Sequence, residues 1–180
     1  TGFMRFLAIS GSARRDSTNT ALLRTAAKMV GPDHSMDVFD GLGNLPVFSP
    51  DREESPLPPT VRDFVSAVER SDGLIISSPE YVRAIPGGLK NAIDWLVSRD
   101  EIISKPVVLM HASHRGDDVL AQLRLVLSTV SAGFRQDIFL RFALMKKTPE
   151  EIEAHLNQPD NRDAIADFLR RCAEACASAD

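Results

Sequence analysis

Short apolar runs alternate with longer helical patterns along the whole chain, and this alternation limits the possible fold more than any other feature. Strands are predicted at 4–10, 35–39, 73–78, 106–111 and 136–140, and helices at 18–30, 58–70, 86–98, 117–131 and 160–177. This alternation is typical of a parallel sheet with helices on both faces. A chain of 180 residues is long enough for one well-buried core and too short for two comfortable ones. We therefore expect one α/β domain over residues 1–180.

Three loops of this predicted sheet should meet at one edge. The runs 73–76 and 106–110 are apolar rather than alternating, which is typical of central strands that helices cover on both faces. In doubly wound sheets, ligands bind beyond the carboxyl ends of the strands, where the winding reverses. The loops at 10–19, 79–86 and 112–118 follow such ends, and we expect the functional site there.

The first of these loops gathers hydroxyl, amide and guanidinium side chains directly before a predicted helix. With Ser17 or Thr18 as the N-cap, a monophosphate would meet unpaired backbone N–H groups at the helix N-terminus. The side chains that could donate to it are Ser12, Ser17, Thr18, Asn19, Thr20 and either Arg14 or Arg15. The glycine and lysine patterns of nucleoside triphosphate and dinucleotide loops are absent. A terminal monophosphate is therefore favoured, and an ordinary polar turn is the alternative.

The second loop is bounded by two prolines. Pro79 and Pro86 stiffen its ends, and Pro86 also suits the first turn of the next helix. A rigid loop presents its backbone amides in a fixed array, which can bind the polar edge of a flat heterocycle and stabilise negative charge on it.

Composition excludes several classes of partner and site. The net charge of −4 and the pI near 5.6 argue against binding to nucleic acid, and no apolar run is long enough to predict a membrane span. Cys172 and Cys176 lie four apart in a helical pattern, where thiols are usually packing groups, so no disulfide framework is expected. We expect a cytoplasmic protein. The four histidines lack metal-binding spacing, so no metal site is expected.

Three segments of the sequence carry a specific resemblance. They are GSARRDSTN at 11–19, PEY at 79–81 and PGGLKNAIDW at 86–95. In these segments and in their spacing the chain resembles the NADPH-dependent FMN reductase family, a flavodoxin-like group that includes quinone, azo-dye and chromate reductases. The resemblance implies a flavodoxin-like doubly wound sheet of five parallel strands in the order 2-1-3-4-5. It also implies a homodimer or homotetramer, with the helix at 86–98 in the interface.

The same resemblance assigns residues to FMN. It implies that Ser12, Arg14, Ser17 and Asn19 hold the phosphate, and that Pro79, Glu80 and Tyr81 line the isoalloxazine. Ser113 and Gly116 would complete the flavin pocket. Many family members have Asn where this chain has Val82, so any contact of Val82 must come from its backbone. Arg83 would act either on the flavin or a nicotinamide phosphate, or in a surface or interface salt bridge.

The resemblance implies an oxidoreductase in which FMN takes a hydride from NADPH or NADH and passes it to a small acceptor by ping-pong kinetics. The acceptor would be a quinone, a flavin, an azo compound or a metal oxyanion. The flavin performs the chemistry, so no catalytic side chain is required, and Tyr81 is a candidate modulator. A flavodoxin-like electron carrier and an FMN-binding redox sensor are the alternatives.

Two segments depart from simple expectations. The third loop lacks the double glycine of many relatives and has Arg115 and two aspartates instead. The proline-rich segment 40–59 has neither a helical nor a strand period, which predicts an ordered surface loop. Alternatively, it overhangs the pocket, with Phe48 as an apolar wall.

Overall fold

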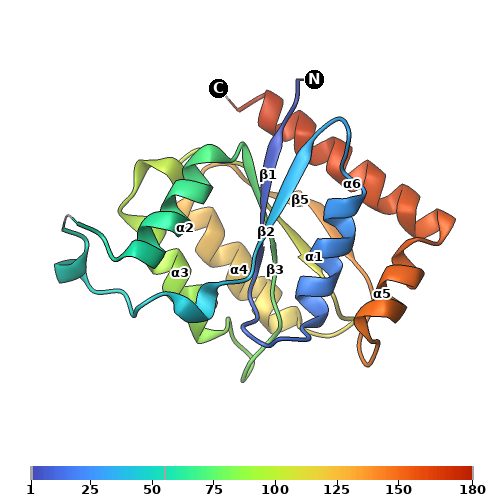
Figure 1. Ribbon diagram of the computed structural model, residues 1–180, viewed down its shortest axis with the longest axis horizontal. Helices are drawn as coiled ribbons and strands as arrows, with labels where there is room; N and C mark the ends of the chain where they lie inside the picture. The colour runs from blue at the N-terminus through green and yellow to red at the C-terminus, as the bar shows by residue number, and fades with distance from the viewer. Residues whose placement is uncertain (1, 55, 180) are drawn as a thin grey trace.

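The structure, a computed structural model, describes residues 2–54 and 56–179. Five parallel strands form one sheet in the order β2-β1-β3-β4-β5, which confirms the expected topology (Figure 1). The strands are β1 (Arg5–Ser10), β2 (Ser35–Phe39), β3 (Gly73–Ser77), β4 (Val107–His111) and β5 (Phe134–Arg141). Their carboxyl ends point downward in Figure 1, away from both chain termini.

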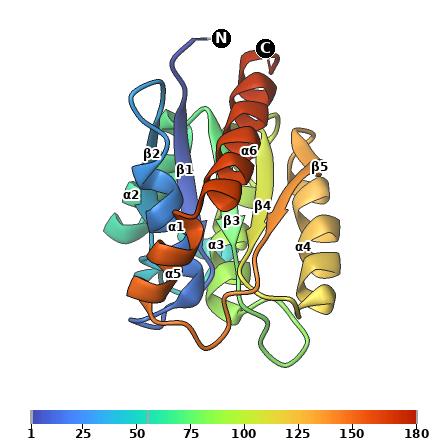
Figure 2. The same ribbon diagram turned by 90° about the vertical axis from the view of Figure 1, so that its right-hand side faces the viewer.

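Among the described residues, six α-helices cover the two faces of this sheet. They are α1 (Thr18–Lys28), α2 (Pro59–Arg70), α3 (Gly87–Val97), α4 (Asp117–Val130), α5 (Pro149–Leu156) and α6 (Pro159–Ala177). In Figure 1 the helices α2, α3 and α4 lie on one side of the sheet, and Figure 2 shows α1, α5 and α6 in front of the other. Within the described residues, no helix has the length and apolar character needed to cross a membrane.

The strands separate two hydrophobic cores. In β1, Phe6 and Ala8 face the core beneath α1 and α6, whereas Leu7 and Ile9 face the core beneath α2 and α3. All five positions of β3 and all five of β4 are buried. Burial on both faces explains why these strands are apolar runs instead of alternating patterns.

One helix was not predicted. The helix α5 begins with a capping box in which Thr148 Oγ1 accepts from the Glu151 N–H at 3.1 Å and Glu151 Oε1 accepts from the Thr148 N–H at 3.0 Å. A threonine followed three residues later by a glutamate is the sequence pattern of a capping box, so the start of this helix could have been predicted from the sequence. Ile152 and Leu156 from this helix are buried in the core beneath α1. The other predicted helices and strands are present, with bounds that differ by up to two residues at their ends.

The segment 40–59 is fastened to α3. It contains two 3-10 turns, η1 (Leu42–Asn44) and η2 (Pro50–Arg52), and a third, η3 (Asp100–Ile102), follows α3. The Pro46 carbonyl accepts from Asn91 Nδ2 and from Trp95 Nε1, both at 2.9 Å, and the Phe48 N–H donates to Asn91 Oδ1 at 2.7 Å. The Phe48 ring packs edge-on against Trp95 with centroids 5.1 Å apart. The alternative of Phe48 as a pocket wall is therefore wrong: Phe48 lies against α3.

Replacement of Asn91 tests this attachment. Asn91→Ala removes the donor to Pro46 and the acceptor for Phe48, so we expect the free energy of unfolding to fall by about 1–3 kcal/mol in urea denaturation. Lys90→Ala, which removes only a half-exposed ion pair with Asp94, is the matched control and should change stability by less than about 1 kcal/mol. Equal losses in the two variants would contradict the assignment.

Candidate functional site

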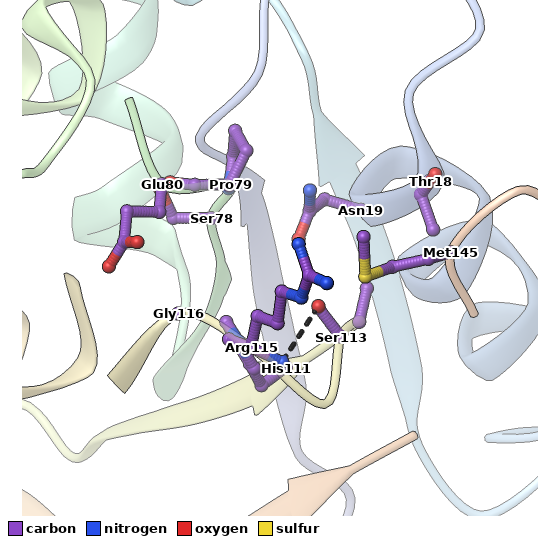
Figure 3. Close-up of a pocket in the computed structure, with 11 residues that line it drawn as sticks. Thr18, Asn19, Ser78, Pro79, Glu80, His111, Ser113, Arg115, Gly116 and Met145 are labelled. Atoms are coloured by element: carbon purple, nitrogen blue, oxygen red, sulfur yellow. Dashed lines mark hydrogen bonds between the residues drawn. The ribbon is translucent and has the colours of Figure 1, made fainter. Parts of the chain in front are cut away.

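A pocket of about 300 Å³ opens at the carboxyl edge of the sheet, where the three predicted loops meet (Figure 3). Six of the residues predicted for the site line it, namely Thr18, Asn19, Pro79, Glu80, Ser113 and Gly116. Sequence reasoning did not assign five further lining residues, which are Ser78, His111, Ala112, Arg115 and Met145. Three of these five, Ser78, Ala112 and Arg115, lie next to predicted residues in the chain, and His111 lies two residues before Ser113. Met145 comes from the segment after β5, where the sequence shows no motif.

The first loop leaves backbone donors at the pocket. Ser17 is the N-cap of α1, and its Oγ accepts from the Thr20 N–H at 3.3 Å. Ser12 is buried, and its Oγ accepts from the Arg14 N–H at 3.2 Å. Among the residues described, none accepts a hydrogen bond from the N–H of Thr18 or Asn19. These two donors at the positive end of the α1 dipole are the groups with which an anion would pair.

Asn19 joins the first loop to β3. Its Oδ1 accepts from the buried Ser77 Oγ at 2.8 Å, so its amide nitrogen is the end that is left for a ligand. The Gly11 N–H donates to the Ser77 carbonyl at 2.8 Å. A Cβ at Gly11 would lie 2.5 Å from Ser78 Oγ, so only glycine allows this approach of the two strand ends.

The second loop is a tight hairpin beside the pocket. Tyr81 and Ala84 exchange backbone hydrogen bonds of 3.1 and 3.0 Å around Val82 and Arg83, whose φ angles are 52° and 58°. Positive φ at both central positions favours Asn and Gly and strains a β-branched residue. Val82 is 98% exposed and Tyr81 47% exposed. Neither lines the pocket, so their assignment to binding stays a prediction.

Side chains of the second loop attach it to α4. Glu80 Oε1 accepts from the Val119 N–H at 2.8 Å and so caps α4, whose own N-cap, Gly116, has no side chain. Arg83 Nε pairs with Asp118 Oδ2 at 2.7 Å on the surface, which favours the salt-bridge alternative for Arg83. Gln122 Oε1 accepts from the Ile85 N–H at 3.0 Å. The Glu80 carboxylate is thus already engaged.

The third loop folds around His111. The His111 Nε2 bonds to the Arg115 carbonyl, and Arg141 donates to the carbonyls of Ser113 at 2.8 Å and Arg115 at 3.0 Å. Gly116 has φ 94°, and a Cβ there would lie 2.7 Å from His111 Nε2. Burial lowers the pKa of His111, and the nearby Arg141 charge lowers it further, although the bond to the carbonyl opposes both. A neutral imidazole that donates through Nε2 fits these contacts.

Of the first-loop residues that the resemblance assigns to FMN, three lie outside the pocket lining. Ser12 and Ser17 use their hydroxyls within the loop, and Arg14 Nη2 donates to the Asp16 carbonyl at 3.1 Å on the exposed side. Their role in binding stays a prediction. The two cysteines of α6 do not line the pocket. They are packing groups, and burial raises the pKa of the Cys176 thiol to about 12.

Comparisons with known proteins agree with this architecture. The sequence model of the family described as "NADPH-dependent FMN reductase" matches residues 4–142. The chain is 41% identical over 92 residues to the 2-hydroxy-1,4-benzoquinone reductase of a Burkholderia species, which covers 51% of this chain and 49% of that protein. It is 31% identical over 113 residues to a quinone reductase of Escherichia coli strain K12, covering 61% and 60%. The chain thus spans about half to three fifths of the length of these relatives.

A solved structure shows the same fold. The flavoenzyme NAD(P)H:(acceptor) oxidoreductase FerB from Paracoccus denitrificans superposes with a TM-score of 0.69 at 24% identity, over 98% of this chain and 96% of that one. At this identity the likeness concerns the fold alone.

Replacement of Gly116 tests the packing of the third loop. Gly116→Ala adds strain at positive φ and a contact with His111, so we expect the free energy of unfolding to fall by about 1–3 kcal/mol. Gly87→Ala, where no atom outside its chain neighbours and its own helix backbone lies within 4 Å of the added Cβ, is the control and should be neutral or slightly stabilising in the same urea titration. A stable Gly116→Ala protein would rule out this packing.

The burial of His111 predicts a pH dependence. Because its pKa in the folded protein is below the ordinary value of 6.5, the unfolded chain binds the proton first and stability falls as pH drops below that value. In His111→Gln we expect a shallower loss of unfolding free energy between about pH 7 and pH 5 than in the wild type. His114→Gln, on the exposed side of the same loop, serves as the matched control. Identical slopes in the wild type and His111→Gln would refute the prediction.

Proposed function

Because the chain belongs to the NADPH-dependent FMN reductase family, we propose that it binds FMN in the pocket at the carboxyl edge and uses it to reduce a small acceptor with NADPH or NADH. The observation that carries the proposal is the pair of N–H groups of Thr18 and Asn19 at the start of α1, beside a pocket that the second and third loops complete.

The residues present fit FMN at both ends. The N–H groups of Thr18 and Asn19 and the Asn19 amide nitrogen would hold the phosphate. Pro79 and the third-loop residues Ala112, Ser113 and Gly116 would lie beside the isoalloxazine, since they form a large part of the remaining lining. When bound, FMN supplies the acceptance and donation of hydride, which no side chain can provide.

The chain's own residues would bind and orient rather than carry protons. Glu80 is occupied as the cap of α4, and His111 is buried and bonded to a carbonyl, so neither is a free acid or base. The rate enhancement would then come mainly from holding first the nicotinamide and then the acceptor against the flavin. Because the two would bind in turn at the same place, the kinetics would be ping-pong. Tyr81, half-exposed next to Glu80, would form a rim against which a flat acceptor packs.

Quinones are the acceptor class that we favour. Two relatives are named as quinone reductases, and the exposed Tyr81 and Val82 offer an apolar edge for a flat ring. Flavins, azo compounds and metal oxyanions are the other acceptors to test. The single domain, the cytoplasmic location and the dimeric or tetrameric assembly stay predictions from the sequence.

The decisive experiment follows the colour of the flavin. The purified protein should take up FMN, lose its visible flavin absorbance rapidly when NADPH or NADH is added without oxygen, and regain it when a quinone is added. Initial rates should give parallel double-reciprocal plots. An electron carrier would bleach slowly with nicotinamide, and a redox sensor would change its association state without steady turnover; either result would replace the proposal.

Replacement of Asn19 tests the phosphate end separately. Asn19→Asp keeps an oxygen acceptor for Ser77 and adds a charge that stabilises the N-terminus of α1, yet repels a phosphate. We expect the Kd for FMN, measured by quenching of flavin fluorescence, to rise at least about tenfold, roughly 1.4 kcal/mol, without loss of stability. Gln136→Glu adds the same charge on the exposed amino half of β5 and should leave the Kd unchanged. An unchanged Kd in Asn19→Asp would remove the phosphate assignment.

A further inference from the structure

The backbone of Arg115 is held in place by three contacts. Its N–H donates to Ser113 Oγ at 3.0 Å, and its carbonyl accepts from Arg141 Nη2 at 3.0 Å and from His111 Nε2. Residues on both sides of it are fixed as well, since Gly116 packs on His111 and α4 begins at Asp117. The side chain therefore starts from a fixed point in the pocket lining.

From that point the guanidinium extends across the pocket. Figure 3 shows the Arg115 side chain reaching past Ser113 toward Asn19, at the amino end of α1. The third loop thus places a cation in the same pocket lining as Thr18 and Asn19 of the first loop, although the two loops are almost a hundred residues apart in the chain.

The carboxylates near Arg115 have other partners. Asp117 pairs with Arg141 at 3.0 Å and Asp118 with Arg83 at 2.7 Å, while Glu80 accepts from a backbone N–H of α4. Across residues 2–54 and 56–179, no salt bridge includes Arg115. Its charge is therefore available to an anionic ligand.

Arg14 has a different environment. Its guanidinium donates to the Asp16 carbonyl within its own loop, on the exposed side, and it does not line the pocket. Of the two arginines, Arg115 is the one that lines the pocket together with Thr18 and Asn19.

We propose that Arg115, rather than Arg14, is the cation that binds the FMN phosphate, so that the phosphate is held between the third loop and the start of α1. This inference rests on the proposed function. A guanidinium offers two parallel N–H donors to a phosphate, which suits a dianion that otherwise meets only neutral donors. The contact makes Arg115 the residue that selects FMN over riboflavin, which has the same ring system without the phosphate.

The test compares these two ligands. Kd values for FMN and riboflavin are measured by fluorescence quenching for the wild type, Arg115→Gln, Arg115→Lys and Arg14→Gln. We expect Arg115→Gln to raise the FMN Kd by about 10–100-fold, the range for a hydrogen bond to a charged group, and to leave the riboflavin Kd unchanged. Arg115→Lys should recover part of the loss, and Arg14→Gln should change the FMN Kd by less than about threefold.

A second readout covers the case in which riboflavin binds too weakly to measure. The phosphorus-31 resonance of protein-bound FMN should shift in Arg115→Lys relative to the wild type and stay in place in Arg14→Gln. Circular dichroism and urea denaturation establish that each variant is folded, which we expect because the Arg115 side chain is exposed and makes no salt bridge within the described residues.

The outcomes separate the inference from the proposed function. Equal losses for FMN and riboflavin in Arg115→Gln would place the guanidinium at the ring and overturn the inference. An unchanged FMN Kd, or a larger loss in Arg14→Gln than in Arg115→Gln, would overturn it too. A wild-type protein that does not bind FMN at all would instead overturn the proposed function.

Discussion

The contact between the carboxyl ends of β1 and β3 sets the geometry on which the pocket depends. Gly11 approaches Ser78 so closely that no Cβ fits, and Asn19 accepts a buried hydrogen bond from Ser77. These contacts fix the start of α1 against the central strand, with two backbone donors turned outward. Because the hydrogen bond between Ser77 and Asn19 is buried, both groups stay paired only when α1 lies in this position against β3. The bond therefore determines the position of the helix as well as contributing to stability.

The start of α4 plays the corresponding role for the other two loops. Its N-cap is a glycine without a side chain, and the missing acceptor is supplied by Glu80 from the second loop. Asp118 and Gln122 bind the same hairpin through Arg83 and Ile85. The hairpin and the third loop are thus supported by one helix, which explains why a tip with two positive φ angles persists.

Much of the fold could be predicted because its signals are local. Burial on both faces makes β3 and β4 continuous apolar runs, and Ser17 was one of two expected N-caps. The helix α5 was missed although its capping box is also local, at 148–151. Of the site, the loops were found and six lining residues were named, but Met145 carries no sequence signal. It reaches the pocket only through the path of the chain after β5.

The sequence by itself determined the α/β alternation, the three loops that form the pocket and the motifs of the family. The partners of the charged side chains were decided only by the tertiary structure. Glu80 as the cap of α4, Arg83 in an ion pair, and Arg115 free of a carboxylate among the described residues all depend on distances between segments that are far apart in the chain. The periodicity of the sequence indicates which face of a helix or strand is buried. It contains no information about which loops face each other in the folded protein.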